Sequence, residues 1–377
     1  MIATGFVYDE RFLAHDAGRI EYRGGEGSAD CGEEFDSPQR LLHIKRLFDA
    51  VGLTPRLASL SCEPASDEQL LRVHTPAYLE SLATICREAG DAVVSFGDEA
   101  RGDGKTEETA RLAAGGACAA IDAVLTGKTP QAYALLRPSG HHAGPDFAMG
   151  YCYYNNAAVA ARHAQAVYGL KRVAIVDWDV HHGNGTQTLF YDDPSVLFVS
   201  LHEEDNYPLD GGDAAETGSG AGEGLNVNIP LPSGSGNTTY RAAFERVVLP
   251  VLAAFEPELI LISAGQDANA FDPLGRMRVT RDGFSAMARW VREAAQTLCG
   301  GRVVVLQEGG YSLPYLPIAT LGVLEGLTGW RADFEDPHRV HDWPLKSAEA
   351  AAIDRARQAQ ACHWPTLNVK PKEDQHA

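Results

Sequence analysis

The sequence predicts an α/β protein in which helices cover both faces of a parallel sheet. Short aliphatic or β-rich runs alternate with amphipathic stretches of helical length, which is the pattern that successive βαβ units produce. The run 173–176 is continuously aliphatic, as expected for a strand buried on both of its faces. Residues 1–8 predict a first strand. Five further strands, each followed directly by polar residues, are predicted at 132–136, 172–176, 195–200, 259–263 and 302–306.

Apolar residues at helical spacing predict helices in the intervals between these strands. One helix begins at Ser37-Pro38, and another has the capping-box spacing of Ser66 and Gln69 at its start. The other stretches, whose apolar faces we assign to core packing, are residues 109–125, 239–255, 281–298 and 347–361.

We expect residues 1–362 to form a single domain, because large α/β enzymes commonly reach this length around one sheet. Residues 363–377 contain two prolines and end in polar and charged residues. This composition predicts a loosely ordered polar tail at the C-terminus.

The chain is acidic, with a formal net charge of −19 and a pI near 5.1. This charge argues against a nucleic-acid partner, which is usually bound by clustered Lys and Arg, and it suits a cationic substrate. Two glycine-rich loops, 24–36 and 203–216, are rich in Asp and Glu. Both loops can be read as solvated surface. The second loop leaves a strand that feeds the predicted site, so it is alternatively a rim that attracts cations to that strand end.

The sequence gives no sign of a membrane or secretory protein. No segment approaches the roughly 20 consecutive apolar residues that cross a bilayer, and the first eight residues lack the basic start of a secretory signal. The seven cysteines are scattered and form no Cys-x-x-Cys pair, so neither a disulfide framework nor a cysteine zinc site is expected. We therefore expect a cytoplasmic protein.

Metal-ligand chemistry follows directly on the predicted strand at 172–176. Asp177, Asp179 and His181 alternate along the extended chain and so fall on the same side of it. Asp267 follows the strand at 259–263 and adds a carboxylate at the same sheet edge, where ligands of open α/β sheets gather. Three protein ligands with open positions are typical of catalytic zinc, although an Asp/His/Asp set also suits ferrous iron or another divalent ion.

Two other strand ends carry groups for acid–base and oxyanion chemistry. The strand at 132–136 is followed by the tandem His141-His142 between glycines, and histidine is the natural acid and base near neutral pH. The strand at 302–306 leads into a glycine-rich turn that presents Tyr311. Together these residues predict metal-assisted hydrolysis, in which the ion polarises a carbonyl and acidifies a bound water. A histidine would take the proton and Tyr311 would stabilise the oxyanion.

Four motifs together resemble the zinc-dependent histone deacetylase family, and most closely its bacterial class II-like branch, the histone deacetylase-like amidohydrolases. They are Gly140-His141-His142, residues 177–187, Ser200-Leu201-His202 and Glu308-Gly309-Gly310-Tyr311. The resemblance covers roughly residues 1–330. It implies an arginase/deacetylase-like three-layer fold with a central, mostly parallel eight-stranded sheet flanked by helices. It also implies a narrow tunnel for an acylated lysine and a homo-oligomer, a dimer or tetramer.

The resemblance assigns a role to each motif residue. His142 would be the general base and acid, His141 its electrostatic partner and Tyr311 the oxyanion donor. One catalytic Zn²⁺ would be held by Asp179, His181 and Asp267.

The same motifs imply a hydrogen-bond partner behind each histidine and a second, structural cation site. Asp177 would lie behind His141, and Asn184 stands where class I members carry an aspartate behind the second histidine. A neutral partner should leave His142 less basic than a carboxylate would. A structural K⁺ would be bound near Asp177, Asp179, His181, Ser200 and Leu201.

The expected substrate tunnel departs from the family pattern. Tyr151, which follows Gly150, and Tyr207 stand where the family usually has phenylalanines, and Gln266 replaces the phenylalanine before the third zinc ligand. These polar groups lead us to expect tolerance for acyl groups or substrates beyond acetyl-lysine. Leu274 stands where polyamine-specific relatives carry an acidic gatekeeper, which disfavours polyamine selectivity, whereas the acidic loops favour a polycation.

The sequence therefore predicts a zinc-dependent amidohydrolase that removes acetyl or other acyl groups from an amine, with acyl-lysine as the first-choice substrate. Acetylpolyamines and other small amides are the alternative substrates. A non-catalytic acyl-lysine binder is the alternative of a different class, but such a protein would be free to lose His142 or Tyr311, and both are present. An arginase-type ureohydrolase fits poorly, since it needs a two-metal Asp/His pattern.

Overall fold

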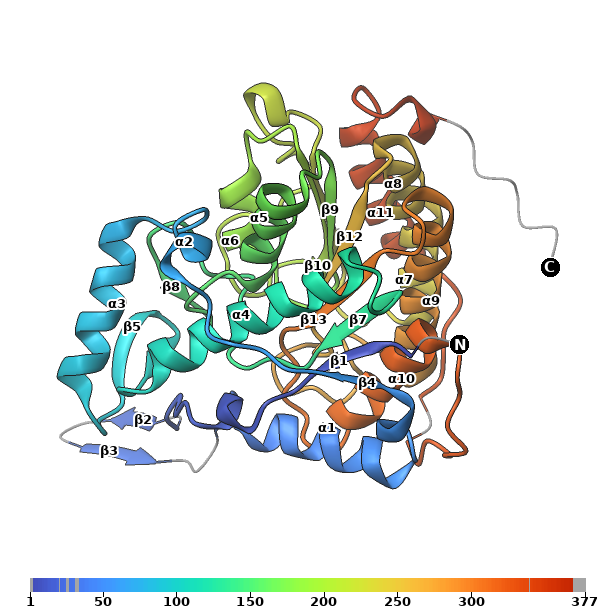
Figure 1. Cartoon of the computed structure of the whole chain (residues 1–377). Helices are drawn as coiled ribbons and strands as arrows, with labels where there is room; N and C mark the ends of the chain where they lie inside the picture. Colours follow the sequence, from blue (N-terminus) through green and yellow to red (C-terminus); the bar gives the residue numbers. More distant parts are fainter. Residues whose placement is uncertain (1–2, 20, 25–26, 31–33, 339, 369–377) are drawn as a thin grey trace.

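Eight strands form the central sheet of the structure (Figure 1), a computed structural model that describes residues 3–19, 21–24, 27–30, 34–338 and 340–368. All neighbouring strands of this sheet run parallel. In sheet order they are β11 (Asn226–Leu231), β10 (Val196–Glu203), β9 (Val173–Asp177), β12 (Leu259–Ala264), β13 (Val303–Gln307), β7 (Gln131–Ala134), β1 (Gly5–Val7) and β4 (Ala58–Leu60).

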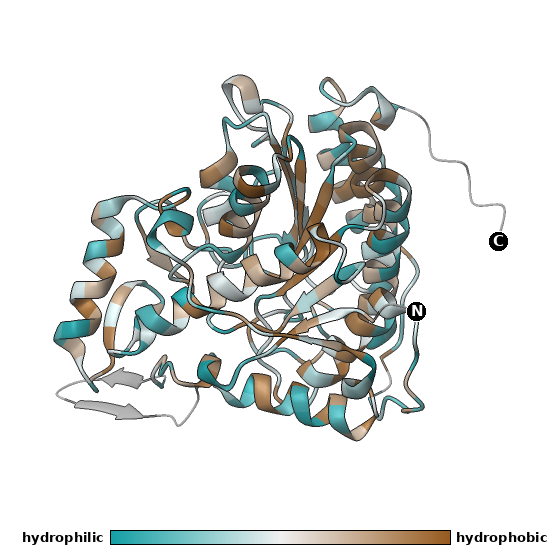
Figure 2. Ribbon diagram, in the orientation of Figure 1, coloured by the Kyte–Doolittle hydropathy of each residue, from teal (hydrophilic) through white to brown (hydrophobic). Residues whose placement is uncertain are grey.

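The sheet confirms the predicted α/β class and the eight-stranded arginase/deacetylase-like fold. The five strands predicted ahead of polar residues are β10, β9, β12, β13 and β7, which lie side by side at the centre of the sheet. Their residues are buried throughout, and Figure 2 shows the hydrophobic colouring of the strands. Asp177 at the end of β9 lies in register with Ser200 on β10 and Ser263 on β12, so the polar residues that follow these strands emerge at one edge.

Two groups of helices cover the faces of the sheet (Figure 1). On one face α4 (Thr106–Leu125) packs against β7 and α5 (Asn156–Tyr168) against β12, with α2 (Asp67–Leu70), α3 (Pro76–Ala89) and α6 (Asn184–Phe190) beside them. On the other face α9 (Arg281–Leu298) packs against β12 and β13. Its neighbours are α7 (Asn237–Ala243), α8 (Leu249–Phe255) and α10 (Leu316–Thr328). Helix α1 (Gln39–Ala50) packs against α10, and α11 (Ser347–Gln360) packs against α7 and β11.

The structure corrects one predicted helix. The stretch 239–255 is not a single α-helix, because a π-helical segment, Phe244–Val248, separates α7 from α8. Pro250 in the first turn of α8 has no backbone N–H to donate into a regular α-helical ladder.

Two smaller sheets lie outside the main one. A hairpin pairs β2 (Glu21–Gly24) with β3 (Gly27–Asp30), and β5 (Val94–Asp98) lies between β6 (Ala100–Gly102) and β8 (Ala148–Met149). Gly24 and residues 27–30 of the predicted acidic loop 24–36 belong to the hairpin, and its residues 25–26 and 31–33 fall outside the described part of the chain.

The start of the predicted loose tail is ordered against the domain. Pro365–Asn368 form a 3₁₀ turn, Leu367 is buried, and the indole N–H of Trp364 donates to the carbonyl of Gly224 at 2.8 Å. The prediction of a loose segment is therefore wrong for residues 363–368, and residues 369–377 lie outside the described ranges. Within those ranges, no helix combines the length and the apolar character that a bilayer span requires.

Candidate active site

The candidate site is a cavity of about 400 Å³ at the carboxyl edge of the central strands. It brings together residues that follow β7, β9, β12 and β13 with residues from loops. The lining residues are Phe35, Glu99, His142, Gly150, Tyr151, His181, Asn206, Tyr207, Leu274 and Tyr311.

The three predicted metal ligands converge beside this cavity. Asp179, His181 and Asp267 are buried, and each offers a ligand atom within 4.8 Å of the other two. Nδ1 of His181 lies 3.0 Å from Oδ1 of Asp179 and 3.3 Å from Oδ2 of Asp267. That Oδ2 atom is buried and has no hydrogen-bond partner among the described residues. Two buried carboxylates and an imidazole at this spacing fit a divalent cation, which would offset the repulsion between the acids.

Backbone groups hold the two carboxylates in this arrangement. The N–H of Gly309 donates to Oδ2 of Asp179 at 2.8 Å, and the N–H of Val180 donates to Oδ1 of Asp267 at 2.8 Å. Burial, with the charge of Asp179, raises the pKa of Asp267 to about 7 in the metal-free protein. The site is therefore electrostatically strained until a cation binds to it.

The tandem histidines have different hydrogen-bond partners. Nδ1 of His141 lies 2.9 Å from Oδ2 of Asp177, whereas Nδ1 of His142 lies 2.7 Å from the amide oxygen of Asn184. The two rings are close, with centroids 4.0 Å apart. Asp177 and Asn184 thus each contact the histidine behind which the sequence placed them.

These partners separate the pKa values of the two rings. Burial lowers the pKa of His141, but the carboxylates of Asp179 and Asp177 outweigh burial and raise that pKa to about 10. Burial lowers the pKa of His142 well below 6.5, and the nearby charges of His141 and His181 lower it further. His142 is consequently neutral at neutral pH, while His141 is an imidazolium.

The loop that carries the two histidines is held by Glu308. Its Oε2 accepts hydrogen bonds from the N–H groups of Gly140 at 2.7 Å and His141 at 3.3 Å, while its Oε1 has no partner among the described residues. Burial raises the pKa of Glu308 to about 7. The sequence motif contained this residue, but sequence reasoning gave it no role.

Tyr311 also lines the cavity and lies in a turn fixed by buried polar groups. Its N–H donates to Oδ2 of Asp272 at 2.8 Å, and the guanidinium of Arg40 lies 4.8 Å from the centre of its ring. Arg40 also donates to the carbonyls of Glu308 and Gly310, at 2.6 Å each. Burial raises the pKa of Tyr311 well above 10, so its hydroxyl keeps its proton and remains a donor.

Four of the five predicted tunnel residues line the cavity: Gly150, Tyr151, Tyr207 and Leu274. The ring of Tyr207 stands edge-on to His142, with centroids 5.3 Å apart, and Tyr151 lies 5.9 Å from Tyr311. Gly150 has φ +52°, and a Cβ built at this position would lie 2.5 Å from Cδ2 of His142. Glycine is therefore required for the close approach of this loop to the histidine.

Gln266 is the exception, because the structure does not bring it to the cavity. Its side chain is buried behind the ligand loop, where its Oε1 accepts from Nε2 of Gln307 at 2.8 Å and from the Thr320 hydroxyl at 3.1 Å. The expectation that Gln266 makes the tunnel more polar is therefore wrong. The two tyrosines that were predicted to make the wall more polar do line the cavity.

Sequence reasoning missed three lining residues, Phe35, Glu99 and Asn206. Phe35 and Glu99 belong to segments that approach the cavity only through the tertiary fold, so no local pattern marks them. Next to Glu99, Asp98 accepts a hydrogen bond from the Tyr207 hydroxyl at 3.2 Å. Asn206 directly precedes Tyr207, and this position next to a predicted tunnel residue was the only feature of the sequence that pointed to it.

The residues assigned to the predicted potassium site also lie together, since Ser200 is in register with Asp177 and Leu201 follows it in β10. The side chain of Ser200 contacts Nδ1 of His202 at 2.9 Å.

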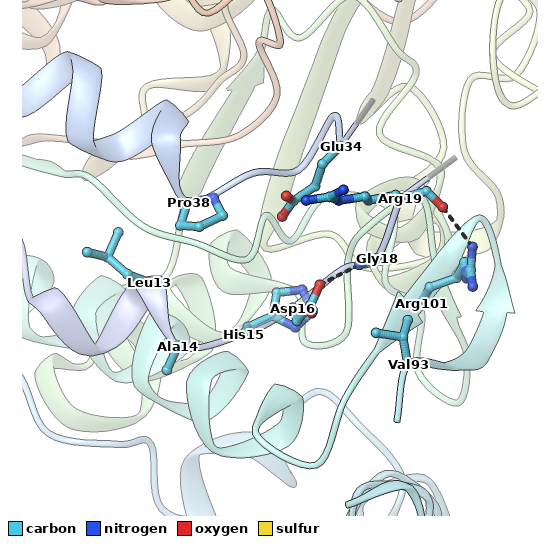
Figure 3. Close-up of a pocket in the computed structure, with 10 residues that line it drawn as sticks. All are labelled: Leu13, Ala14, His15, Asp16, Gly18, Arg19, Glu34, Pro38, Val93 and Arg101. Carbon is cyan, nitrogen blue, oxygen red and sulfur yellow. Dashed lines mark hydrogen bonds between the residues drawn. The ribbon is translucent and has the colours of Figure 1, made fainter. Parts of the chain in front are cut away.

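A different cavity, of about 520 Å³, lies against the segment that follows β1 (Figure 3). Arg19 and Glu34 face each other across it, and Arg101 donates to the carbonyl of Arg19 at 3.1 Å. It contains none of the predicted metal or catalytic residues. The predicted catalytic and metal-binding residues therefore line or adjoin the 400 Å³ cavity instead.

Comparison with known proteins agrees with this geometry. The family model described as "Histone deacetylase domain" matches residues 34–327. The chain is 45% identical to the histone deacetylase-like amidohydrolase of Pseudomonas aeruginosa over 94% of this chain and 93% of that protein. It is 39% identical to the human polyamine deacetylase HDAC10 over 89% of this chain and 50% of that protein. The crystal structure of the HDA15 HD domain superposes with a TM-score of 0.84 at 36% identity, covering 97% of each chain.

Proposed function

The chain belongs to the histone deacetylase family of metal-dependent amide hydrolases, and we propose that it removes an acyl group from an amine bound in the 400 Å³ cavity. The observation that carries this proposal is the convergence of three metal ligands, a neutral histidine and a protonated tyrosine on one cavity. The scissile carbonyl would lie between His142 and Tyr311, with the acyl-amine chain passing between Tyr151 and Tyr207.

We propose Zn²⁺ as the catalytic ion, held by Asp179, His181 and Asp267. When bound, such an ion polarises a carbonyl and lowers the pKa of water. Its charge would also lower the raised pKa of Asp267, so that all three ligands are in their metal-binding protonation states. We further propose K⁺ as a structural ion near Asp177 and the Ser200 and Leu201 carbonyls.

His142 is suited to move the proton in this reaction. The amide oxygen of Asn184 accepts from Nδ1 of His142, which places the ring proton on Nδ1 and leaves a lone pair on Nε2. Because the ring is neutral, Nε2 can accept a proton from the attacking water and then donate it to the leaving amine. The charged His141 beside it keeps the ring from being protonated prematurely.

Tyr311 supplies the hydrogen bond to the developing oxyanion. Its raised pKa keeps the hydroxyl protonated, and Asp272 and Arg40 hold the turn from which it projects. A donor that is already in place stabilises the transition state without reorganisation, which is the usual origin of large rate effects from oxyanion donors.

The substrate class follows from the walls of the cavity. Tyrosine rings on two sides fit the narrow methylene chain of an acylated lysine, which we propose as the substrate, and the tyrosine hydroxyls favour acyl groups other than acetyl as well. Acylated polyamines are the second candidate, because Glu99 places a carboxylate at the described wall and a polyamine deacetylase is among the relatives.

The test is hydrolysis by the purified zinc-loaded protein across one panel of substrates. The panel contains acetyl-lysine and trifluoroacetyl-lysine peptides, longer acyl-lysines, N-acetylated polyamines and simple anilides, each with and without a hydroxamate inhibitor. Hydroxamate-sensitive turnover that Tyr311→Phe abolishes supports the proposal. Absence of turnover from all amides, with zinc bound, would instead favour a non-catalytic acyl-lysine binder.

A further inference from the structure

A second cavity lies beside the active site and is formed by the acidic loop 203–216. Its volume is about 250 Å³, and Asn206 and Tyr207 line both this cavity and the active-site cavity. The residues of its lining that carry charge or an unused acceptor are His182, Glu203, Glu204, Asp205, Asp213 and Glu216. None of these residues has a part in the proposed hydrolysis.

Three of the carboxylates in this cavity are not neutralised within the described part of the chain. Glu203 pairs with Arg276 at 2.7 Å and Glu204 pairs with Arg355 at 2.8 Å. By contrast Asp205, Asp213 and Glu216 form no ion pair with any described residue. The hydrogen bonds to Asp213 and Glu216 come from backbone or amide N–H groups. The cavity therefore presents an excess of negative charge.

A buried histidine that lines this cavity also has an unused acceptor. The Gln187 amide is oriented unambiguously: its Nε2 donates to the carboxylate of Glu216 at 2.5 Å, and its Oε1 accepts from Asn226 and Asn228. The same Oε1 lies 3.0 Å from Nε2 of His182. Nε2 of His182 must therefore carry the ring proton, which leaves a lone pair on Nδ1.

Nδ1 of His182 has no hydrogen-bond partner among the described residues, although the side chain is only 2% exposed. It lies against Gly211 and Gly212, since a Cβ built at Gly212 would be 3.2 Å from it. Buried acceptors are nearly always satisfied, so an empty acceptor here indicates a ligand that brings a hydrogen-bond donor.

The spacing of the acidic groups in this cavity suits an organic cation better than a metal ion. Within the described ranges, the His, Cys, Asp and Glu groups close enough to share an ion are Asp179, His181 and Asp267, and His141, Cys152 and Glu308. The acids of this cavity are too widely spaced to join them. A primary ammonium group can instead donate three hydrogen bonds to separated acceptors, and Tyr207, Pro208 and Pro230 offer apolar surface to a methylene chain.

We propose that this cavity binds a primary alkylammonium group and selects acylated amines that carry a second, charged amine. Selection of substrate rests on the proposed hydrolysis, whereas amine binding does not. The ammonium has two possible sources, a free acylated polyamine or a lysine side chain that flanks an acyl-lysine in a peptide.

The first experiment measures binding without catalysis. Calorimetry would follow titration of 1,5-diaminopentane into the zinc-loaded protein, with the active-site cavity filled by a hydroxamate and 1-pentanol as the uncharged control. Asp205→Asn with Asp213→Asn removes two charges and keeps the backbone contacts, since Asn tolerates the φ of +58° at position 205. Asp210→Asn is the matched control, because Asp210 belongs to the same loop but does not line the cavity.

We expect saturable binding of the diamine that weakens about tenfold in the double variant and not in Asp210→Asn. Equal affinities in all three proteins, or no saturable binding to the wild type, would overturn the proposal.

The second experiment compares substrates. The double variant should raise KM about tenfold for N-acetylated diamines and triamines, or for acetyl-lysine peptides with a neighbouring lysine, and leave a neutral N-alkylacetamide unchanged. Whichever charged substrate loses its advantage identifies the source of the ammonium. Turnover that is equal for charged and neutral substrates would refute the amine subsite but would still support the proposed hydrolysis. Amine binding without turnover of any substrate would support the subsite but contradict the proposed hydrolysis.

Discussion

Asn184→Asp is the most direct test of how the protein sets the basicity of its proton carrier. The amide oxygen of Asn184 lies 2.7 Å from Nδ1 of His142, so the substitution places a carboxylate at hydrogen-bond distance from the ring with almost no change in shape. An anion this close to an imidazole favours the imidazolium and raises its pKa by about 1–3 units.

The rate consequence follows from the protonation state of the base. In the wild type the pKa of His142 is held well below 6.5, so the neutral, active ring persists into acidic solution. Each unit by which the variant raises this pKa lowers the neutral fraction about tenfold at pH values below both pKa values. We therefore expect the acidic limb of the kcat/KM profile to move to higher pH by about 1–3 units.

The assay is a pH profile of kcat/KM between pH 5 and 9 on the best substrate from the panel, with zinc content checked at each pH. Thr188→Asp provides the control, since Thr188 is exposed on the same helix α6 and its substitution adds the same charge away from the ring. An acidic limb that stays in place in Asn184→Asp, or moves equally in both variants, would show that His142 is not the titrating base.

Three further outcomes are expected. His142→Ala and Tyr311→Phe should retain zinc and lose about 10²–10⁴ in kcat, whereas Asp267→Ala should lose the metal itself, as elemental analysis will show. Gly150→Ala should lower kcat at least about tenfold with zinc retained, because its Cβ would lie 2.5 Å from His142. Chelation should lower Tm, and more so as pH rises from 5 to 8. The raised folded pKa of Asp267, about 7, makes the metal-free protein lose stability as that carboxyl ionises, and a Tm difference independent of pH would contradict this.

The sequence was sufficient to predict the centre of the fold because that part of the chain has a strong pattern. Strands β7, β9, β10, β12 and β13 are β-rich or aliphatic and buried throughout, and each leads into polar residues at one edge. The strands that were not predicted, β4 and β11, lie at the two edges of the sheet. β4 has only three residues, and β11 contains two asparagines and a proline, so neither shows the aliphatic run that identified the others.

The sequence predicted which residues gather near the site, but it did not predict the direction in which each side chain points. The proposed metal ligand Asp267 and its neighbour Gln266 were both expected at the active site. The side chain of Gln266 instead turns to Gln307 and Thr320, because successive side chains leave an extended backbone on different sides. Glu99 reaches the cavity from a loop. Its position depends on how the β5 segment packs against Tyr151, whose N–H donates to the Glu99 carbonyl at 3.1 Å, and such long-range packing has no local sequence signal.

The tandem histidines show why the partner matters more than the residue type. His141 and His142 are adjacent, equally buried and within 4.0 Å of each other, yet one is held charged and the other neutral. The difference arises behind the rings, where a carboxylate faces His141 and an amide faces His142. A fixed positive charge next to a neutral base keeps that base ready to accept a proton, and environments that drive two neighbouring pKa values apart are what assign acid and base roles in an active site. The division of labour in this site is therefore encoded at positions 177 and 184 rather than in the histidines themselves.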